Sequence, residues 1–137
     1  RMVWAGENHS NDGSIIVFSD YNTAFGVDWL AVRAFPRSLY GSEIDTWVEV
    51  TDLLVSLEPA RIVPGHTSHG VIGDLDDAVA YNQMFRDLRD ALQQVLEYGV
   101  SKDEFLFHIS MSPYSEWVRY DGGLQGLAGQ AYDLATQ

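Results

Sequence analysis

Apolar positions divide the chain into short β-prone runs, followed by longer segments with helical periodicity. The first runs are Met2 to Ala5, Ile15 to Phe18 and Thr23 to Val27, and a turn signal at Asp20-Tyr21-Asn22 separates the last two. An uninterrupted run of β-branched and aromatic residues is typical of a strand buried on both faces. We therefore predict three strands, the second and third of which form a hairpin that ends at Asp28.

Residues 29–41 contain Pro36 and Gly41 and read as a loop with two exposed arginines, Arg33 and Arg37. The spacing of Ser42 and Asp45 is that of a capping box, which predicts that a helix begins there and continues until Pro59. The apolar stripe of this helix is Ile44, Trp47, Val48, Leu54 and Val55. Its periodicity predicts that this stripe faces the core. Arg61-Ile62-Val63 predicts a short fourth strand.

The last part of the chain reads as helical. Asp74 is the expected N-cap of a long helix that ends before Gly99. The apolar face of this helix is Leu75, Val79, Phe85, Leu88, Leu92 and Val95. Ser101 with Glu104 opens a short helix through Phe107, and the tail from Pro113 is expected to be helical near its end. The order β-β-β-α-β-α-α predicts one α/β domain over residues 1–137, with a helical tail from about residue 101.

Composition supports a folded, acidic protein. The apolar fraction is 46%, and 20 acidic side chains outnumber 8 basic ones, giving a formal charge of −12. Such a field repels phosphate backbones, so we expect no nucleic-acid partner. The chain has no cysteine, so any metal site must use His, Asp, Glu or water. No apolar stretch reaches membrane-spanning length and no signal peptide is apparent, so a cytoplasmic protein without a membrane partner is expected.

Three short segments each place a metal-ligand residue type just after a predicted strand. They are Glu7 to Ser14, which contains His9, then Phe25 to Asp28, and Val63 to His66. Strand ends at one edge of a sheet are where α/β folds gather ligand groups. Two imidazoles and one carboxylate suit zinc, iron or manganese. Taken singly, each residue is more often a hydrogen-bonded loop residue or a helix cap than a ligand.

Together and in order, these segments resemble the later motifs of the metallo-β-lactamase superfamily. That family typically has a His-Thr-x-Gly-Asp-Ser-like segment, then Phe-x-Gly-Asp, then Val-Pro-Gly-His-Gly. His9-Ser10 with Asp12-Gly13-Ser14 matches the first with Asp and Gly transposed. Phe25-Gly26-Val27-Asp28 matches the second with Val27 where glycine is usual, and Val63 to Thr67 matches the third. The resemblance covers about residues 1–105.

The resemblance implies half of an αββα sandwich, with a mixed sheet and helices on one face. It implies that His9 binds one metal, that His66 binds a second, and that Asp28 bridges both as the catalytic carboxylate. In the intact family fold the metal is zinc, or iron or manganese, and the substrates are esters, lactams and thioesters. The family's His-x-His-x-Asp-His motif is absent here, so we expect this chain alone to bind metal weakly and to be inactive. His69 could substitute as a ligand, whereas His108 has no suitable spacing.

Two functional hypotheses follow from the missing half. The chain is either the C-terminal part of a metal-dependent hydrolase, seen as a fragment, or a non-catalytic dimeric α/β module derived from that fold. Under both hypotheses we expect the free sheet face to pack against another protein surface. That surface is either the missing N-terminal half or a second copy in a homodimer. The sequence does not name the substrate. The loop from Trp29 to Tyr40 and the tail from Met111 are expected to shape the pocket, and Arg33 and Arg37 either hold an anionic substrate group or are solvated.

Overall fold

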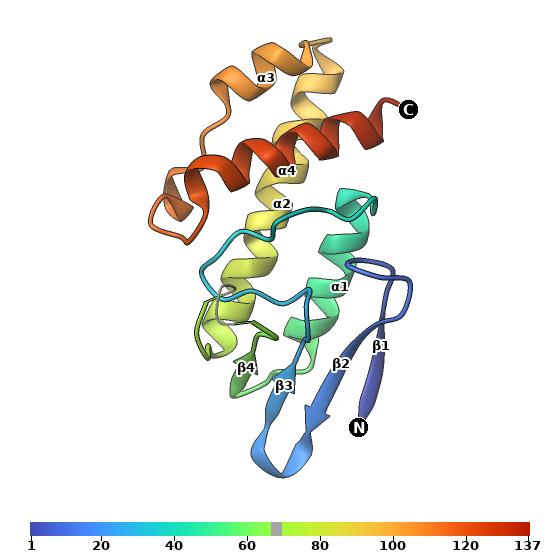
Figure 1. Cartoon of the computed structure of the whole chain (residues 1–137), viewed down its shortest axis with the longest axis vertical. Coiled ribbons are helices and arrows are strands. Elements are labelled where there is room, and N and C mark those ends of the chain that lie inside the picture. The colour runs from blue at the N-terminus through green and yellow to red at the C-terminus, as the bar shows by residue number, and fades with distance from the viewer. Residues whose placement is uncertain (67–69) are drawn as a thin grey trace.

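The computed structural model describes residues 1–66 and 70–137, and its elements follow the predicted order (Figure 1). The strands are β1 (Met2–Gly6), β2 (Gly13–Phe18), β3 (Thr23–Phe25) and β4 (Arg61–Val63). The α-helices are α1 (Ile44–Ser56), α2 (Leu75–Glu97), α3 (Lys102–His108) and α4 (Tyr120–Ala135). Two short 3-10 helices, η1 (Ser19–Tyr21) and η3 (Ser112–Tyr114), lie between them. The α/β class and the helical tail are therefore confirmed.

The four strands form one mixed sheet in the order β1-β2-β3-β4. β1 pairs antiparallel with β2, and β2 antiparallel with β3, across a turn in which Asn22 takes the left-handed conformation at φ 43°. β4 pairs parallel with β3, which requires the crossover that α1 provides. Consequently β1, β3 and β4 run in one direction, and the segments that follow them leave the sheet at the same edge.

One face of the sheet is covered by helices. Ala5, Ile15, Ala24 and Ile62 point to this face and are at most 6% exposed. α1 packs against β1, α2 packs against β4, and the two helices pack against each other. α1 and α2 form one layer on the sheet (Figure 1), which confirms a sheet with helices on one face.

The opposite face of the sheet carries the alternate side chains, and we call it the open face. By the strand register it includes Met2, Trp4, Ile16, Phe18 and Phe25. Met2 is 71% exposed, Trp4 67% and Phe18 49%, so nothing within the described residues covers this part of the sheet. An apolar row of this kind is what one layer of a two-sheet sandwich presents.

The start of α1 differs from its prediction. Glu43 is the N-cap and makes no side-chain cap bond, so the Ser42–Asp45 capping box was wrong. The Ser42 hydroxyl instead donates to the carbonyl of Asn8, 2.9 Å away, and ties the β1–β2 loop to the helix. The buried stripe also differs, because Val50 and Thr51 join it and Val55 is only half-buried.

The predicted caps of α2 are correct. The carboxylates of Asp74 and Asp77 form a reciprocal capping box, and Gly99 follows the helix with φ 66°. The predicted stripe was wrong in the first turns, where Val79 is 46% exposed and Leu75 half-buried. The buried stripe contains Ala78, Tyr81, Phe85, Leu88 and Leu92. Asp77 is buried in the first turn at this capping box, and Val79, two residues later, faces outward.

The loop between β3 and α1 is part of the core rather than a pocket wall. Leu30, Ala34, Phe35 and Leu39 are fully buried in it, while Arg33 and Arg37 are exposed as predicted. α4 packs on α2 and α3 at the end of the molecule away from the sheet (Figure 1). The loop from Trp29 to Tyr40, which was expected to shape the pocket, contributes only Trp29 to the lining of the strand-end pockets described below, and the tail from Met111 contributes no lining residue.

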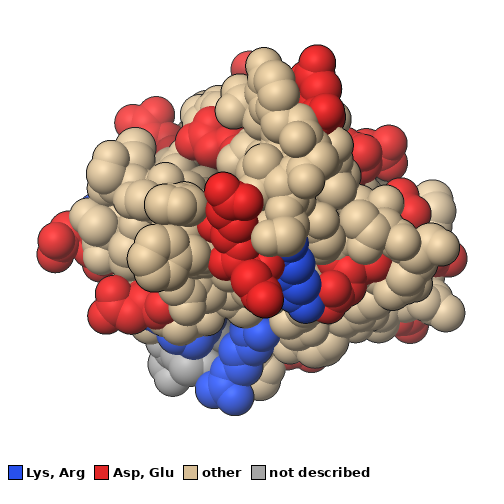
Figure 2. Space-filling view, turned by 90° about the horizontal axis from the view of Figure 1, so that it is seen from above, with Lys and Arg blue, Asp and Glu red and all other residues tan. Residues whose placement is uncertain are grey.

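Acidic side chains are spread over the helical end of the molecule. Figure 2 shows this end, where the basic side chains are confined to one half of the view. Among the described helices, none combines the length and apolarity that crossing a lipid bilayer requires.

Candidate functional site

The three predicted ligand residues follow the three strands that run in one direction. His9 lies in the loop after β1, Asp28 follows β3, and His66 follows β4. Because these strands end at the same edge of the sheet, the parallel and antiparallel pairing brings the three segments to one side of the domain.

Asp28 and His66 are in direct contact. The Asp28 Oδ1 and the His66 Nε2 lie 2.5 Å apart, with side chains that are 42% and 57% exposed. The two loops are joined by backbone hydrogen bonds, from Gly65 to the carbonyl of Val27 at 2.7 Å and from Gly26 to the carbonyl of Val63 at 3.3 Å. These backbone hydrogen bonds between the two loops therefore place Asp28 and His66 side by side.

Residue 65 must be glycine for this approach. A Cβ at position 65 would lie 2.3 Å from the carbonyl oxygen of Val27, a distance that no relaxed packing allows. Val27 itself has φ 52°, a left-handed conformation that costs a β-branched residue energy. Glycine adopts this conformation freely, whereas a valine at position 27 adds backbone strain next to Asp28.

The loop after β1 is held by Asn8, which the sequence analysis did not single out. Asn8 is 1% exposed, and its Oδ1 accepts from the backbone N–H of His9 at 2.5 Å. Its amide packs against Gly13, where a Cβ would lie 2.6 Å from the Asn8 Oδ1. The Asn8 Nδ2 is buried without a hydrogen-bond partner among the described residues. Asn8 therefore fixes the direction in which the His9 side chain projects from the loop.

His9 shares a pocket with Asp28 but not with His66. The pocket has a volume of about 290 Å³, and its walls include Asp12, Val27 and Trp29. His66 lines a neighbouring open pocket of about 640 Å³ with Val71 and Ile72. The other face of His9 meets Tyr40, with ring centroids 4.0 Å apart. Tyr40 lies 31 residues after His9 in the sequence, and no pattern in the sequence would have paired the two.

These residues do not by themselves fit a complete metal centre. Within residues 1–66 and 70–137, no three His, Asp or Glu side chains lie close enough to hold one ion. Two atoms that bind one tetrahedral zinc ion at its usual bond lengths stand about 3.4 Å apart. The Asp28 Oδ1 and the His66 Nε2 are only 2.5 Å apart, so a shared ion would have to displace one of the two side chains.

The remaining predicted residues lie elsewhere. His69 falls outside the described residues. His108 ends α3, at the far end of the molecule from the sheet, and its ring lies beside Phe107 (Figure 1). Arg33 donates to Asp77 at 2.7 Å, and this hydrogen bond raises the pKa of Arg33. Arg33 is therefore already paired, whereas Arg37 forms no ion pair with any residue that the structure describes.

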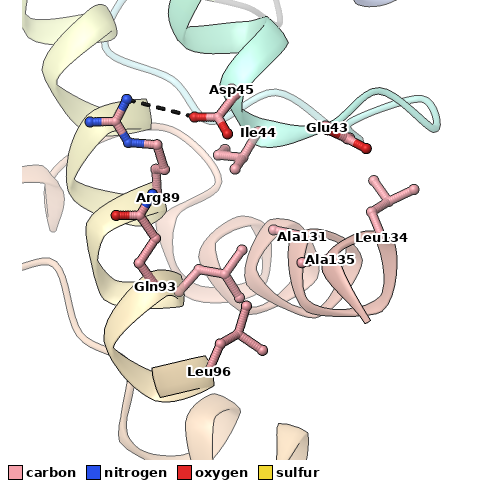
Figure 3. Close-up of a pocket in the computed structure, with 10 residues that line it drawn as sticks. Glu43, Ile44, Asp45, Arg89, Gln93, Leu96, Ala131, Leu134 and Ala135 are labelled. Atoms are coloured by element: carbon pink, nitrogen blue, oxygen red, sulfur yellow. Dashed lines mark ion pairs between the residues drawn. The ribbon is translucent and has the colours of Figure 1, made fainter. Parts of the chain in front are cut away.

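A further pocket of about 270 Å³ lies between the start of α1, the second half of α2 and the end of α4 (Figure 3). Its walls include Leu96, Ala131 and Leu134, and Arg89 lies at its side. The Arg89 guanidinium is 3.7 Å from Asp45 and 3.2 Å from Asp90. Its charge is thus balanced within the chain.

Comparison with known proteins gives a likeness of fold. No protein-family model and no curated protein matches the sequence. Among solved structures, the chain is similar to the metallo-β-lactamase VMB-1, crystallised at pH 5.5, with 18% identity and a TM-score of 0.46. The match covers 63% of this chain and 40% of that one, so this chain spans less than half of that protein. A likeness at this TM-score establishes neither a shared site nor a shared activity.

Proposed function

We propose that this chain is the C-terminal part of a metal-dependent hydrolase of the metallo-β-lactamase superfamily. In this proposal Asp28 and His66 are metal ligands, His9 serves a neighbouring metal position, and the other ligands come from a protein layer that packs on the open face. The observation that carries the proposal is that the parallel strands β3 and β4 end side by side and bring Asp28 and His66 together, where a bound ion would move the two side chains apart. Three separate motifs place these residues in the family's order.

The geometry around the pair supports a built site rather than a chance surface contact. Gly65 is required by its approach to Val27, and the strained φ of Val27 lies directly before Asp28. Backbone strain of this kind persists only where the surrounding structure over-determines it, and it gathers at functional sites. A surface ion pair that served only stability would be worth little and would not require either feature.

The experiment is a cobalt or zinc titration of the full chain, read by the absorption of bound cobalt or by competition with a chromophoric chelator. We expect weak binding, because only two ligands meet at one point. Asp28→Asn and His66→Gln should abolish it, and His9→Gln should weaken it. His108→Gln is the matched control and should have no effect. Equal binding by the His66→Gln and His108→Gln variants would reject the proposed ligand pair.

A specific observation also favours the second candidate function, a non-catalytic dimeric module. Met2, Trp4 and Phe18 together expose a large apolar surface on the open face. Burial of apolar surface contributes about 25 cal/mol per Å², so a second copy that paired face to face would be stabilised. A closed two-fold pair is the commonest way to bury such a face.

Light scattering across a dilution series tests this candidate. We expect a dimer that Trp4→Ser weakens, because Trp4 lies on the open face and is 67% exposed. Phe107→Ser is the control, since Phe107 is 82% exposed but lies on α3, away from the sheet. A wild-type chain that stays monomeric at all concentrations would reject the dimer. A dimer with no metal binding would favour the module over the hydrolase.

A further inference from the structure

The turn from Leu39 to Ser42, which we call the Tyr40 turn, is strained at its centre. The N–H of Ser42 donates to the carbonyl of Leu39 at 2.9 Å, and the two central residues have positive φ angles, 52° at Tyr40 and 80° at Gly41. Glycine, asparagine and aspartate dominate the centre of such turns, because larger side chains are strained there. A tyrosine at position 40 is therefore a strained choice, and strain of this kind persists only where the surrounding structure holds it.

The helical tail holds one side of the Tyr40 turn. Gln130 on α4 is half-buried, and its Oε1 accepts hydrogen bonds from the Ser38 hydroxyl and from the N–H of Leu39, both at 2.8 Å. The N–H of Tyr40 donates to the oxygen of the same Ser38 hydroxyl at 2.9 Å. One side-chain oxygen of the tail therefore holds the chain before the turn and, through Ser38, the strained residue itself.

The other side of the Tyr40 turn is tied to the loop that carries His9. The Ser42 hydroxyl donates to the carbonyl of Asn8 at 2.9 Å, and the Oδ1 of the buried Asn8 side chain accepts from the N–H of His9. The Tyr40 ring packs on the His9 ring, with centroids 4.0 Å apart and planes inclined by 49°. The backbone of His9 and its imidazole are therefore both held by groups that belong to the turn or are bonded to it.

We propose that Tyr40 is a positioning residue that fixes the His9 imidazole at the pocket shared with Asp28, and that Gln130 acts with it by holding the turn. His9 lines that pocket, whereas Tyr40 and Gln130 do not. Tyr40 is 43% exposed, so burial of its ring offsets little of the strain, and the contact with His9 gives the strain a purpose. Groups that surround a metal ligand commonly fix its orientation in this way. The inference rests on the proposed function only in calling His9 a ligand.

The test is NMR spectroscopy of the full metal-free chain, in which three-bond couplings report whether the His9 side chain keeps one χ1 rotamer. We expect one rotamer in the wild type and in Tyr40→Phe, which keeps the ring. Tyr40→Asn removes the ring but suits the left-handed turn, so the couplings of His9 should become averaged while the midpoint of urea unfolding stays the same or rises. An averaged His9 in the wild type, or a single rotamer in Tyr40→Asn, would overturn the proposal.

A second set of variants tests the part of the tail while both rings remain. Gln130→Leu removes the oxygen that accepts both hydrogen bonds, so the couplings of His9 should become averaged and the NOEs between the His9 and Tyr40 rings should weaken. Gln130→Glu keeps an accepting oxygen and should restore both signals. Gln125→Leu is the matched control, because Gln125 also lies on α4 but donates to the carbonyl of Leu106 at 3.4 Å. Equal effects of Gln130→Leu and Gln125→Leu would reject the role of Gln130.

A cobalt titration of the same variants separates this inference from the proposed function. If both hold, Tyr40→Asn should weaken cobalt binding to the same extent as His9→Gln, and Tyr40→Phe should leave it unchanged. A single His9 rotamer that depends on Tyr40, without any cobalt binding, would reject the metal site alone. Cobalt binding by a wild-type chain whose His9 side chain is averaged would reject the positioning role alone.

Discussion

Loops are usually exposed and sheets are usually buried, but two regions of this molecule show the reverse. They are the loop from Trp29 to Leu39 and the open face of the sheet. The loop has no helix or strand, yet Leu30, Phe35 and Leu39 are fully buried in it. The open face belongs to the regular sheet, yet Met2 and Trp4 are among the most exposed apolar side chains of the described chain. The two regions differ in which parts of the protein pack against them.

The loop is buried because other elements satisfy its backbone. Tyr81 donates to the carbonyl of Trp29, Trp47 donates to that of Leu39 at 3.3 Å, and Gln130 accepts from the N–H of Leu39 at 2.8 Å. Phe35 and Val118 form a backbone bond of 3.0 Å. A buried backbone group without a partner would cost as much as a lost hydrogen bond. The open face belongs to a hydrogen-bonded sheet, but its apolar side chains find no partner among the described residues and stay exposed.

The largest expected effect comes from the loop. Phe35→Ala should lower the free energy of unfolding by about 3–5 kcal/mol, because it leaves a cavity beside Trp117 and Tyr120. Phe18→Ala on the open face should cost less than about 1 kcal/mol in the monomer, since Phe18 is already 49% exposed. Urea unfolding at low protein concentration measures both. Similar losses would show that the two regions are buried alike in solution.

Gly65→Ala should come next, with a loss of about 2–3 kcal/mol. The added Cβ would meet the carbonyl oxygen of Val27 at 2.3 Å and push apart the two loops that hold Asp28 and His66. Gly126→Ala is the control, because nothing lies within 4 Å of its Cβ position in α4. That change should stabilise by about 0.5–1 kcal/mol through helix propensity. A harmless Gly65→Ala variant would contradict the close contact of these loops.

Tyr81→Phe should cost about 1–2 kcal/mol at neutral pH, because it leaves the carbonyl of Trp29 without its donor. Burial raises the pKa of Tyr81 in the folded state. Its stabilising contribution is therefore complete below the ordinary tyrosine pKa of about 10 and is lost as the pH rises above that value. The difference between wild type and variant should shrink in alkaline solution. A difference that stayed constant with pH would mean that the Tyr81 hydroxyl is not buried.

Val27→Gly should have the smallest effect and the opposite sign. It removes the cost of a left-handed valine, about 1–2 kcal/mol, and adds the flexibility cost of glycine, about 0.5–1 kcal/mol. We expect a net gain of less than about 1 kcal/mol in thermal unfolding, with the Asp28–His66 contact retained in NMR spectra. A clear loss of stability would show that the half-buried Val27 side chain contributes more by packing than its backbone strain costs.

The sequence by itself determined the local elements and the place of the candidate site. The β2–β3 hairpin, the caps at Asp74 and Ser101 and the turn at Gly99 depend on neighbouring residues, and the structure confirms them. The α/β class and the packing of the helices on one face of the sheet followed from the order of these elements. Asp28 and His66 could be anticipated as neighbours because strand order fixes which loops share an edge.

Only the tertiary structure decided which polar and apolar groups found partners. Ser42 has a capping spacing, but its hydroxyl bonds to Asn8, 34 residues away. Val79 fits the apolar period of α2, but the packing of α2 against α1 and β4 buries Ala78 and Tyr81 and leaves Val79 at the surface. The burial of Phe35 and the pairing of Arg119 with its carbonyl depend on α4, which folds back over the loop. Local spacing cannot encode such contacts, because each requires a distant segment to lie at one position and orientation in space.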